Sequence, residues 1–427
     1  MDRYIIDGSY PIQGRVRASG NKNAALPCIA ATLLTDETVV LKNIPEIEDV
    51  GVMLEILKKM GASVKKRKIR GEWEIKATDI KSSEVPFDLA KRIRASILLA
   101  GPLLARTGQV ILAPPGGDVI GRRRLDTHFL ALSALGAQVE VDGVFRFTCN
   151  KLVGIDIFLD EASVTATENA IMASVLADGK TIIQNAASEP HVQDLCVMLN
   201  QMGAKINGIG SNILRIEGVQ KLGGTEFKIG ADFMEVGSFV GLAAVTRGEV
   251  IIEDAAPAHL KMAKIAFGKL GIHWERDGED IRIPSGQALR VIPDLGGMIP
   301  KIDDAPWPGF PPDLTSIMTV VATQVEGTVL VHEKMFDARM FFVDKLIAMG
   351  AKIVLCDPHR AVVSGPSRLT GSELTSPDVR AGMAMVIAAI CAEGKSIIHN
   401  VYQIERGYER LAERLQSLGA RIERQND

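Results

Sequence analysis

The stretch LIAMGAKI at 346–353 contains the unit that decides the fold. Its first half continues an amphipathic helix, its glycine suits the left-handed C′ position after a helix, and its last residues begin a strand-like run. The same phrase recurs in order as LKKMGASV (57–64), LSALGAQV (132–139), LNQMGAKI (199–206), GKLGIHW (268–274), LIAMGAKI (346–353) and LQSLGARI (415–422). Six ordered copies indicate a chain built from an internal repeat.

A second phrase recurs between copies of the first: a small apolar helix, a turn and a short strand. Its copies are AATLLTDETVVLKN (30–43), LLARTGQVILAP (103–114), SVLADGKTIIQN (174–185), AAVTRGEVIIED (243–254), ATQVEGTVLVHE (322–333) and AICAEGKSIIHN (389–400). Each repeat of roughly 70 residues therefore holds two helices and several strands.

The two helices of a repeat differ in character. The second, as in VMLEILKKM at 52–60, is amphipathic, whereas the first, as in RAGMAMVIAAICA at 380–392, is apolar nearly all round and belongs in an interior. Three repeats per domain would place three apolar helices at a centre with sheets outside. We predict an α+β fold, an inside-out α/β barrel or alpha-beta prism, with six repeated βαβαββ-type units in two similar domains.

The chain of 427 residues is long enough for two domains. We expect one domain over 21–229, with the catalytic loop, and a second over 1–20 plus 230–427, with an active-site cleft between them.

Composition excludes several classes of function. The formal net charge of −3 provides no overall basic field for nucleic acid. The five scattered cysteines and isolated histidines form no metal-binding or disulfide pattern. No apolar stretch is long enough to span a bilayer, and nothing resembles a signal peptide. We expect a cytoplasmic protein without a metal or other cofactor.

Polar residues open the apolar helices at equivalent repeat positions. Counting back from each turn gives Lys22–Asn23, Arg94, Ser163–Thr165, Met234–Glu235, Asp313 and Asp378–Arg380. Counting back from each Gly-Ala predicts that the second helices begin near Asp49, Arg123, Glu189, Arg339 and Arg406.

Acidic residues at helix starts can act as simple caps, which is the structural explanation for Asp49, Glu189 and Glu235. Cations there oppose the helix dipole. A single cation is most simply a solvated side chain. Six at equivalent positions instead favour an anion site, for a small, multiply charged ligand with phosphate and carboxylate groups.

The segment APPGGDVIGRRRLDTH at 113–128 is a glycine-rich loop with Asp118 at its tip. Such loops often close over a substrate and exclude water. A Gly-Asp turn without any catalytic role explains Asp118 equally simply.

With these motifs in view, the whole chain resembles the UDP-N-acetylglucosamine 1-carboxyvinyltransferase family of enolpyruvyl transferases. The motifs that carry the resemblance are SGNKNAALP (19–27), KRIRASILLAGPLLAR (91–106), PGGDVIG (115–121) followed by Arg123 and LDTH (125–128), SVTATEN (163–169), FPPD (310–313), SPDVRAG (376–382) and IERGYER (404–410).

The resemblance implies transfer of enolpyruvyl from phosphoenolpyruvate to the 3-hydroxyl of UDP-N-acetylglucosamine, with release of phosphate, at the start of peptidoglycan precursor synthesis. The catalytic residues it implies are Asp118, Asp313, Lys22 and Arg406, with Asp313 as the base. Those implied for phosphoenolpyruvate are Lys22, Arg123 and Arg406 on the phosphate, with Arg94, Arg339 and Arg380 completing the cationic lining. Those implied for UDP-N-acetylglucosamine are Asn23, Arg94, Arg123, Arg124, Leu125, Asp126, Thr127, Ser163, Val164, Thr165, Asp313 and Met335. Asp378 and Glu189 match polar positions around the site.

Several positions depart from the family. Most relatives have cysteine where this chain has Asp118, which must be protonated to act as the acid and should not react with fosfomycin as a thiolate does. Arg124, Thr127, Phe233, Asp337 and Ala338 also differ, so the donor half matches better than the nucleotide half.

Three alternatives follow from these observations. The acceptor could be another sugar nucleotide, or shikimate 3-phosphate as in the sister family, although the Asn21-Lys22-Asn23 context argues against the latter. The chain could also be a non-catalytic repeat scaffold, but a scaffold gives no reason for the recurring cations.

Overall fold

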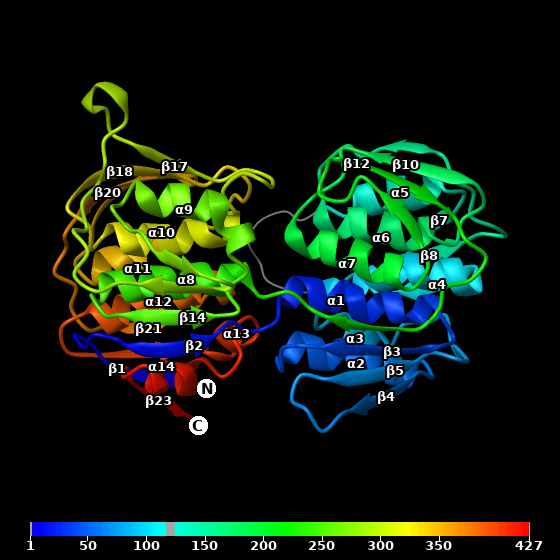
Figure 1. Cartoon of the computed structure of the whole chain (residues 1–427), viewed down its shortest axis with the longest axis horizontal. Coiled ribbons are helices and arrows are strands. Elements are labelled where there is room, and N and C mark those ends of the chain that lie inside the picture. The colour runs from blue at the N-terminus through cyan, green and yellow to red at the C-terminus, as the bar shows by residue number, and fades with distance from the viewer. Residues whose placement is uncertain (1, 117–123, 427) are drawn as a thin grey trace. The chain divides into compact units, whose positions relative to one another are not determined.

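The computed structural model describes residues 2–116 and 124–426, and it divides into two compact units. Among the described residues, the N-terminal unit holds 20–116 and 124–230, and the C-terminal unit holds 2–19 and 231–426. The ribbon of each unit can be followed in Figure 1.

Three sheets and their helices make up the N-terminal unit. The sheet orders are β13-β3-β5-β4, β6-β8-β7 and β11-β12-β10-β9. The strands are β3 (Thr38–Lys42), β4 (Ser63–Lys66), β5 (Trp73–Lys76), β6 (Gln109–Leu112), β7 (Gln138–Val141), β8 (Phe145–Thr148), β9 (Asp156–Phe158), β10 (Lys180–Gln184), β11 (Lys205–Asn207), β12 (Ile213–Glu217) and β13 (Thr225–Lys228). The helices are α1 (Lys22–Ala31), η1 (Thr32–Leu34), α2 (Glu48–Lys59), α3 (Phe87–Ala90), η2 (Arg94–Leu99), α4 (Ala100–Thr107), α5 (Asp126–Ala134), α6 (Val164–Ser174) and α7 (Pro190–Gln201).

The C-terminal unit repeats this plan with sheets β15-β16-β14-β2, β17-β18-β20-β19 and β21-β22-β1-β23. Its strands are β1 (Arg3–Asp7), β2 (Gly14–Arg17), β14 (Val250–Glu253), β15 (Glu275–Asp277), β16 (Asp280–Ile283), β17 (Lys301–Asp303), β18 (Gly327–His332), β19 (Lys352–Asp357), β20 (Arg360–Gly365), β21 (Glu373–Thr375), β22 (Lys395–His399) and β23 (Arg421–Gln425). Its helices are α8 (Phe233–Val245), η3 (Pro257–Leu260), α9 (Lys261–Gly268), η4 (Leu295–Gly297), η5 (Pro312–Leu314), α10 (Thr315–Ala322), α11 (Val343–Ala348), α12 (Val379–Cys391), α13 (Tyr402–Glu405) and α14 (Leu411–Ser417).

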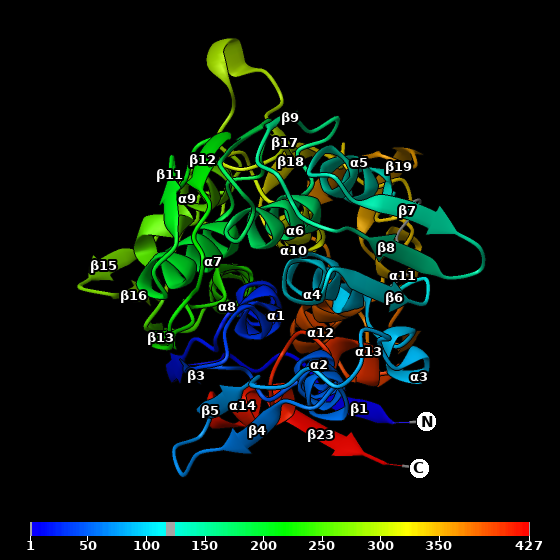
Figure 2. The same ribbon diagram turned by 90° about the vertical axis from the view of Figure 1, so that its right-hand side faces the viewer.

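Apolar helices form the centre of each unit, as their composition predicts. Every residue of α8 and α10 is buried, and α8, α10 and α12 contact one another. In the N-terminal unit α4 contacts α6, and α1 contacts η2; Figure 2 shows α1, α4 and α6 with the strands of that unit around them. The prediction of helices inside and sheets outside is confirmed.

Small residues allow the central helices to pack closely. A Cβ atom added at Gly241 of α8 would lie 2.8 Å from Val321 Cγ2 of α10, and one at Gly237 would lie 2.7 Å from Leu314 Cδ1. Larger side chains at these glycines would therefore push α8 away from α10 and from Leu314 of η5.

The first strands of the chain belong to the C-terminal unit because of their pairing. β1 lies between β22 and β23, antiparallel to both, and β2 runs parallel to β14. The chain then enters the N-terminal unit and returns at Ala231, so the N-terminal segment completes two sheets of the later repeats.

The repeat glycines adopt the predicted left-handed backbone. All six, at 61, 136, 203, 271, 350 and 419, have positive φ. Five directly follow the C-cap of an amphipathic helix, whereas Gly271 lies one residue further on, because α9 ends with its C-cap at Lys269.

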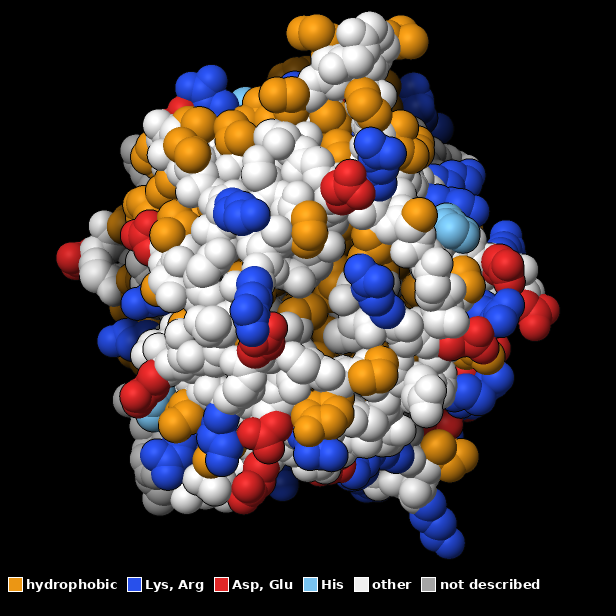
Figure 3. Space-filling model, turned by 90° about the vertical axis from the view of Figure 1, so that its left-hand side faces the viewer, with side chains coloured by type: hydrophobic (Ala, Val, Ile, Leu, Met, Phe, Trp, Pro, Cys, Tyr) orange, Lys and Arg blue, Asp and Glu red, His pale blue; other side chains and the backbone are white. Residues whose placement is uncertain are grey.

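Apolar side chains project from the segment between β16 and β17. Leu295 is 98% exposed, and Ile292, Met298 and Ile299 are also exposed. Figure 3 shows apolar side chains gathered on this side of the molecule. These residues lie outside the core. None of the helices in the described ranges combines the length and apolar character needed to cross a membrane.

Candidate active site

Asp313 lies between two arginines in the C-terminal unit. It belongs to η5, directly before the buried helix α10. Arg339 Nη2 donates to Asp313 Oδ1 at 2.9 Å, and Arg380 Nε donates to Asp313 Oδ2 at 2.9 Å. The two guanidinium groups are almost fully buried, while the Asp313 side chain remains 23% exposed. The carboxylate is thus clamped but still accessible.

The charges of this cluster control its titration. Burial by itself would raise the pKa of Asp313, but the charges and hydrogen bonds of Arg339 and Arg380 outweigh it and hold the pKa well below the usual range. Asp313 is therefore a carboxylate near neutral pH, and a weak base while both arginines remain on it.

The arginines are held by their own surroundings. The Asp378 carboxylate accepts hydrogen bonds from the backbone N–H groups of Arg380 and Ala381 and so caps α12. The Arg380 guanidinium lies 5.2 Å from the centre of the Tyr408 ring, and that of Arg339 lies 4.7 Å from the Phe336 ring. Both contacts are favourable for cations over aromatic faces.

Lys22 forms a buried ion pair in the N-terminal unit. It is the first residue of α1, and its Nζ lies 2.6 Å from Asp49 Oδ2 in the first turn of α2. The Asn21 side chain caps α1 by accepting from the N–H groups of Asn23 and Ala24. This cap places the lysine at the helix start despite the unfavourable dipole.

A polar network joins predicted nucleotide-binding residues of the same unit. Arg94 Nη2 donates to the carbonyl oxygen of Arg124, whose own guanidinium contacts Asp126 and Asp160. Thr127 Oγ1 donates to Asp160 Oδ1 at 2.8 Å. The sequence reasoning missed Asp160, which connects Arg124 to Thr127.

The 163–165 segment begins α6, with Ser163 as its N-cap residue and Val164 as its first residue. The buried His128 Nε2 lies 3.1 Å from Thr165 Oγ1, and its Nδ1 lies 2.9 Å from Asn169 Nδ2. Burial and, to a smaller extent, the charge of Arg94 together lower the pKa of His128 to about 3. A neutral His128, also missed from the sequence, therefore supports Thr165.

Two predicted helix starts are wrong. Arg406 is the C-cap of the short helix α13, where its Nη1 donates to Gln403 Oε1 at 3.0 Å, and α14 begins only at Leu411. Arg339 lies in turns before α11, which begins at Val343. In both places an irregular segment replaces the first turns of the expected helix. Both side chains are nevertheless almost fully buried.

None of the three acidic residues for which capping was the structural explanation is the side-chain cap of its helix. Asp49 pairs with Lys22, Glu235 pairs with Arg414, and Glu189 makes no side-chain capping bond. Of these three helices, α8 is capped by the side chain of Asp232, whereas α2 and α7 have no side-chain cap bond.

The remaining predicted residues belong to several different elements. Leu125 is the N-cap residue of α5, Asn23 follows Lys22 in α1, and Met335 is exposed after β18. Asp118 and Arg123 lie outside the described residues.

Two positions that depart from the family have structural neighbours. Phe233 is buried, with its ring 5.8 Å from that of Trp307 and 6.3 Å from that of His259. Asp337 Oδ1 lies 3.7 Å from His359 Nε2. Phe233 therefore serves the core of the C-terminal unit.

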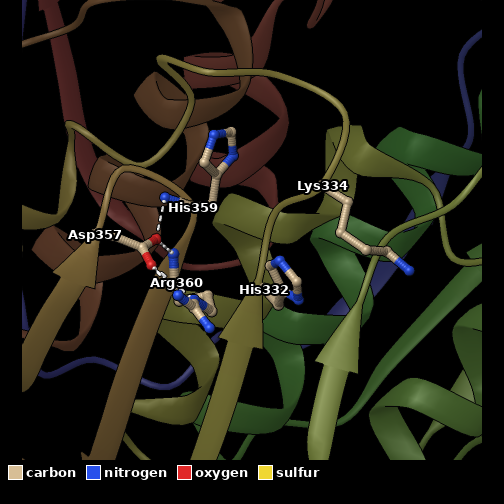
Figure 4. Close-up of a pocket in the computed structure, with 5 residues that line it drawn as sticks. All are labelled: His332, Lys334, Asp357, His359 and Arg360. Atoms are coloured by element: carbon tan, nitrogen blue, oxygen red, sulfur yellow. Dashed lines mark hydrogen bonds and ion pairs between the residues drawn. The ribbon is translucent and has the colours of Figure 1, made fainter.

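A shallow pocket over sheet β17-β18-β20-β19 contains none of the predicted residues. It is lined by His332, Lys334, Asp357, His359 and Arg360. Figure 4 shows Asp357 turned toward Arg360, with Lys334 extended on the far side of His332. Its chemistry is that of paired surface charges, so the Asp313 cluster is the better candidate for catalysis. Among the described residues, no group of three or more His, Cys, Asp or Glu side chains could hold a metal ion.

Comparisons with known proteins show the family to which the chain belongs. The family model described as EPSP synthase (3-phosphoshikimate 1-carboxyvinyltransferase) matches residues 6–415. The chain is 68% identical to a UDP-N-acetylglucosamine 1-carboxyvinyltransferase of Treponema denticola and 65% identical to one of Treponema pallidum, in both cases over 99% of each chain. The crystal structure of the enolpyruvyl transferase NikO from Streptomyces tendae matches with a TM-score of 0.89, at 22% identity, over 100% of this chain and 99% of that one. The last match supports the fold, and the full-length identities identify the family: the chain belongs to the UDP-N-acetylglucosamine 1-carboxyvinyltransferases, within the wider EPSP synthase family of enolpyruvyl transferases.

Proposed function

We propose that the protein transfers the enolpyruvyl group of phosphoenolpyruvate to the 3-hydroxyl of UDP-N-acetylglucosamine and releases phosphate. The observation that carries this proposal is the 65–68% identity, over nearly the whole chain, to proteins named for that transfer. The partly exposed Asp313 carboxylate between two buried arginines supports the proposal, because the reaction needs a base close to cations.

The reaction proceeds by addition and elimination. The acceptor oxygen bonds to C2 of phosphoenolpyruvate, the hydroxyl proton goes to a base, and C3 gains a proton from an acid. In the second step C3 loses a proton, the C2–O bond to phosphate breaks, and the double bond returns. The chemistry requires one base, one acid and cations that stabilise the phosphate and carboxylate charges.

Asp313 is our candidate for the base. Its two arginine partners make it a weak one. An incoming carboxylate or phosphate would compete for the same guanidinium N–H groups, and each hydrogen bond withdrawn from Asp313 would raise its pKa. Donor binding would thereby strengthen the base at the moment when it is needed.

We assign six cations to phosphoenolpyruvate. They are Lys22, Arg94, Arg123, Arg339, Arg380 and Arg406. Bidentate guanidinium groups suit a phosphate and a carboxylate on one small molecule. Lys22, Arg339 and Arg380 are each paired with a carboxylate, which limits the cost of burying them.

We assign UDP-N-acetylglucosamine to the 163–165 segment, to the 124–127 segment and to Asn23, Arg94, Arg123, Asp313 and Met335. The network through Asp160 and His128 fixes the first two segments. Asp118 is our candidate for the acid at C3, a role inferred from the sequence alone.

In the cell we propose a cytoplasmic enzyme that starts peptidoglycan precursor synthesis, and so supports cell shape and division. Because Asp118 replaces the cysteine that fosfomycin alkylates, we also propose fosfomycin resistance.

Product analysis by mass spectrometry tests the acceptor. Incubation with phosphoenolpyruvate and UDP-N-acetylglucosamine should yield a product heavier than the acceptor by one enolpyruvyl group. A mixture that also contains UDP-glucose and UDP-N-acetylgalactosamine tests the alternative that departures at Arg124, Thr127 and Phe233 select another sugar nucleotide. Preferential transfer of the enolpyruvyl group to one of these competitors would overturn the proposed acceptor.

A further inference from the structure

Two buried carboxyl groups lie side by side behind Arg339. β17 ends at Asp303 and β18 ends at His332, and these two residues are register partners in a parallel pair. The next residue of each strand, Asp304 and Glu333, therefore emerges at the same edge of the sheet. Both are fully buried.

One oxygen of each carboxyl is used locally. Asp304 Oδ1 accepts from the N–H of Lys334 at 2.5 Å, and Glu333 Oε1 accepts from the N–H groups of Met335 and Phe336, both at 3.1 Å. These bonds fix the start of the segment that leads to Arg339.

The other two oxygens have no donor among the described residues. Asp304 Oδ2 and Glu333 Oε2 are buried and accept no hydrogen bond from an N–H or O–H group, yet the two side chains are within hydrogen-bonding reach of each other. Two ionised carboxylates in this position would repel each other without solvent screening. A single proton between them satisfies both oxygens at once.

The charge of this pair faces the active-site arginine. Arg339 Nε lies 3.9 Å from Glu333 Oε2, while Arg339 Nη2 binds Asp313. Asp304 and Arg339 are the charged side chains that act on the titration of Glu333, and His359 Nδ1 lies 2.9 Å from the backbone carbonyl oxygen of Glu333. Asp313 binds the Nη2 group of Arg339, and one negative charge on the Asp304–Glu333 pair faces the Nε group of the same guanidinium.

We propose that Asp304 and Glu333 share one proton, and that this singly charged carboxyl pair positions Arg339 and, through it, Asp313. The part that concerns Asp313 rests on the proposed function. Burial, followed by the hydrogen bond and charge of Asp304, raises the pKa of Glu333 to about 8, in keeping with a retained proton. Both are positioning residues, since neither needs to touch a substrate.

The sign of the pH effect follows from this proton. Below about pH 8 the folded protein holds a proton that an unfolded carboxyl releases above its ordinary pKa near 4.3. The contribution of this proton to the stability of the folded protein is therefore fully present below the pKa of the unfolded carboxyl. It is lost as the pH rises through the pKa of the folded pair. At pH 7, unfolding should release about one proton from the pair.

The Asp304→Asn variant tests the shared proton. Its amide can accept from Lys334 N–H and donate permanently to Glu333, so the pair keeps one negative charge without a titrating proton. We expect unfolding at pH 7 to release about one proton fewer than in the wild type, with a flatter loss of stability between pH 7 and 9. Asp303→Asn is the matched control: it removes the neighbouring carboxylate that pairs with Lys334 at the surface and should leave proton release unchanged.

Proton release equal to that of the wild type in Asp304→Asn would overturn the proposal. If that variant does not fold, infrared spectroscopy of the wild type decides instead. A band from a buried protonated carboxyl should be present at pH 7 and lost above pH 9, and its absence at pH 7 would also overturn the proposal. Neither measurement needs substrate, so both remain valid if the proposed transfer fails.

Enzymatic assays test the link to Arg339. Glu333→Gln places an amide N–H group toward either Asp304 or Arg339, and we expect a lower kcat with a smaller change in KM. Asp304→Asn should keep the neutral kcat and lose the alkaline fall in kcat that this pair causes in the wild type. Equal effects of the two substitutions at every pH would contradict a positioning role for the pair.

Discussion

Arg380 Nε donates to Asp313 Oδ2 at 2.9 Å, from the first turn of the almost fully buried helix α12 to η5, directly before α10. The bond joins two repeats of the C-terminal unit at equivalent places. It neutralises a buried cation and holds a carboxylate in a defined orientation, but it also weakens that carboxylate as a base. Substrate must therefore change this contact for the reaction to proceed as proposed.

Asp313→Asn should lower turnover by at least about 100-fold, because general-base assistance commonly contributes that much. Phosphate release under saturating substrates measures it. Phosphoenolpyruvate should still bind, since all six assigned cations remain.

The same substitution has a stability cost. Removing the carboxylate leaves Arg339 and Arg380 without a shared counter-ion, and we expect a loss of roughly 1–3 kcal/mol, below the full value for a buried pair because Asp313 is partly exposed. Asp303→Asn provides a comparison outside the cluster. Turnover of Asp313→Asn within a factor of about three of the wild type would remove Asp313 from the role of base.

Lys22→Met should abolish turnover and weaken donor binding, because it removes a cation assigned to phosphoenolpyruvate. It also takes the lysine partner from the buried Asp49 and should destabilise the protein by roughly 1–3 kcal/mol. Adding Asp49→Asn should restore most of this stability but none of the turnover. Denaturant unfolding and phosphate release separate the two effects, and recovery of activity in the double variant would contradict the assignment.

The buried His128 predicts a loss of stability in acid. Its folded pKa of about 3 lies below the unfolded value near 6.5, so the unfolded chain binds the additional proton between these values. Stability should fall by about 1.4 kcal/mol for each pH unit from this residue as the pH drops below 6.5. His128→Gln, which can keep both neighbours hydrogen-bonded, should show a shallower slope. The same slope in both proteins would mean that His128 does not titrate in this way.

The identity of residue 118 predicts the response to fosfomycin. A carboxylate is a poorer nucleophile toward an epoxide than a thiolate, so the wild type should show no time-dependent inactivation. Asp118→Cys should gain it, whereas Asp118→Asn should lose turnover and keep donor binding. A covalent adduct on Asp118 in the wild type would contradict the first expectation.

The fold could be predicted from the sequence because each repeat contains short-range signals for its helices and turns. The glycine after each amphipathic helix, such as Gly350, and the apolar run of α12 are short-range signals that need no tertiary information. Asp313 and Arg380 are far apart in the chain and no local pattern links them, so their hydrogen bond is visible only in the structure.

The wrong predictions of helix starts and the missed carboxyl groups also have physical reasons. Arg339 and Arg406 lie in irregular segments whose helices begin several residues later, because turns that satisfy backbone groups locally are not visible in apolar periodicity. Asp304 and Glu333 were missed because each appears as an ordinary strand-end carboxylate. Only the parallel register of β17 and β18 brings them together in the interior.

The proposed transfer is tested most simply by phosphate release from phosphoenolpyruvate with UDP-N-acetylglucosamine, compared with release in the presence of shikimate 3-phosphate. We expect release that depends on UDP-N-acetylglucosamine and none above background with shikimate 3-phosphate. Release with shikimate 3-phosphate alone, or with neither acceptor, would contradict it.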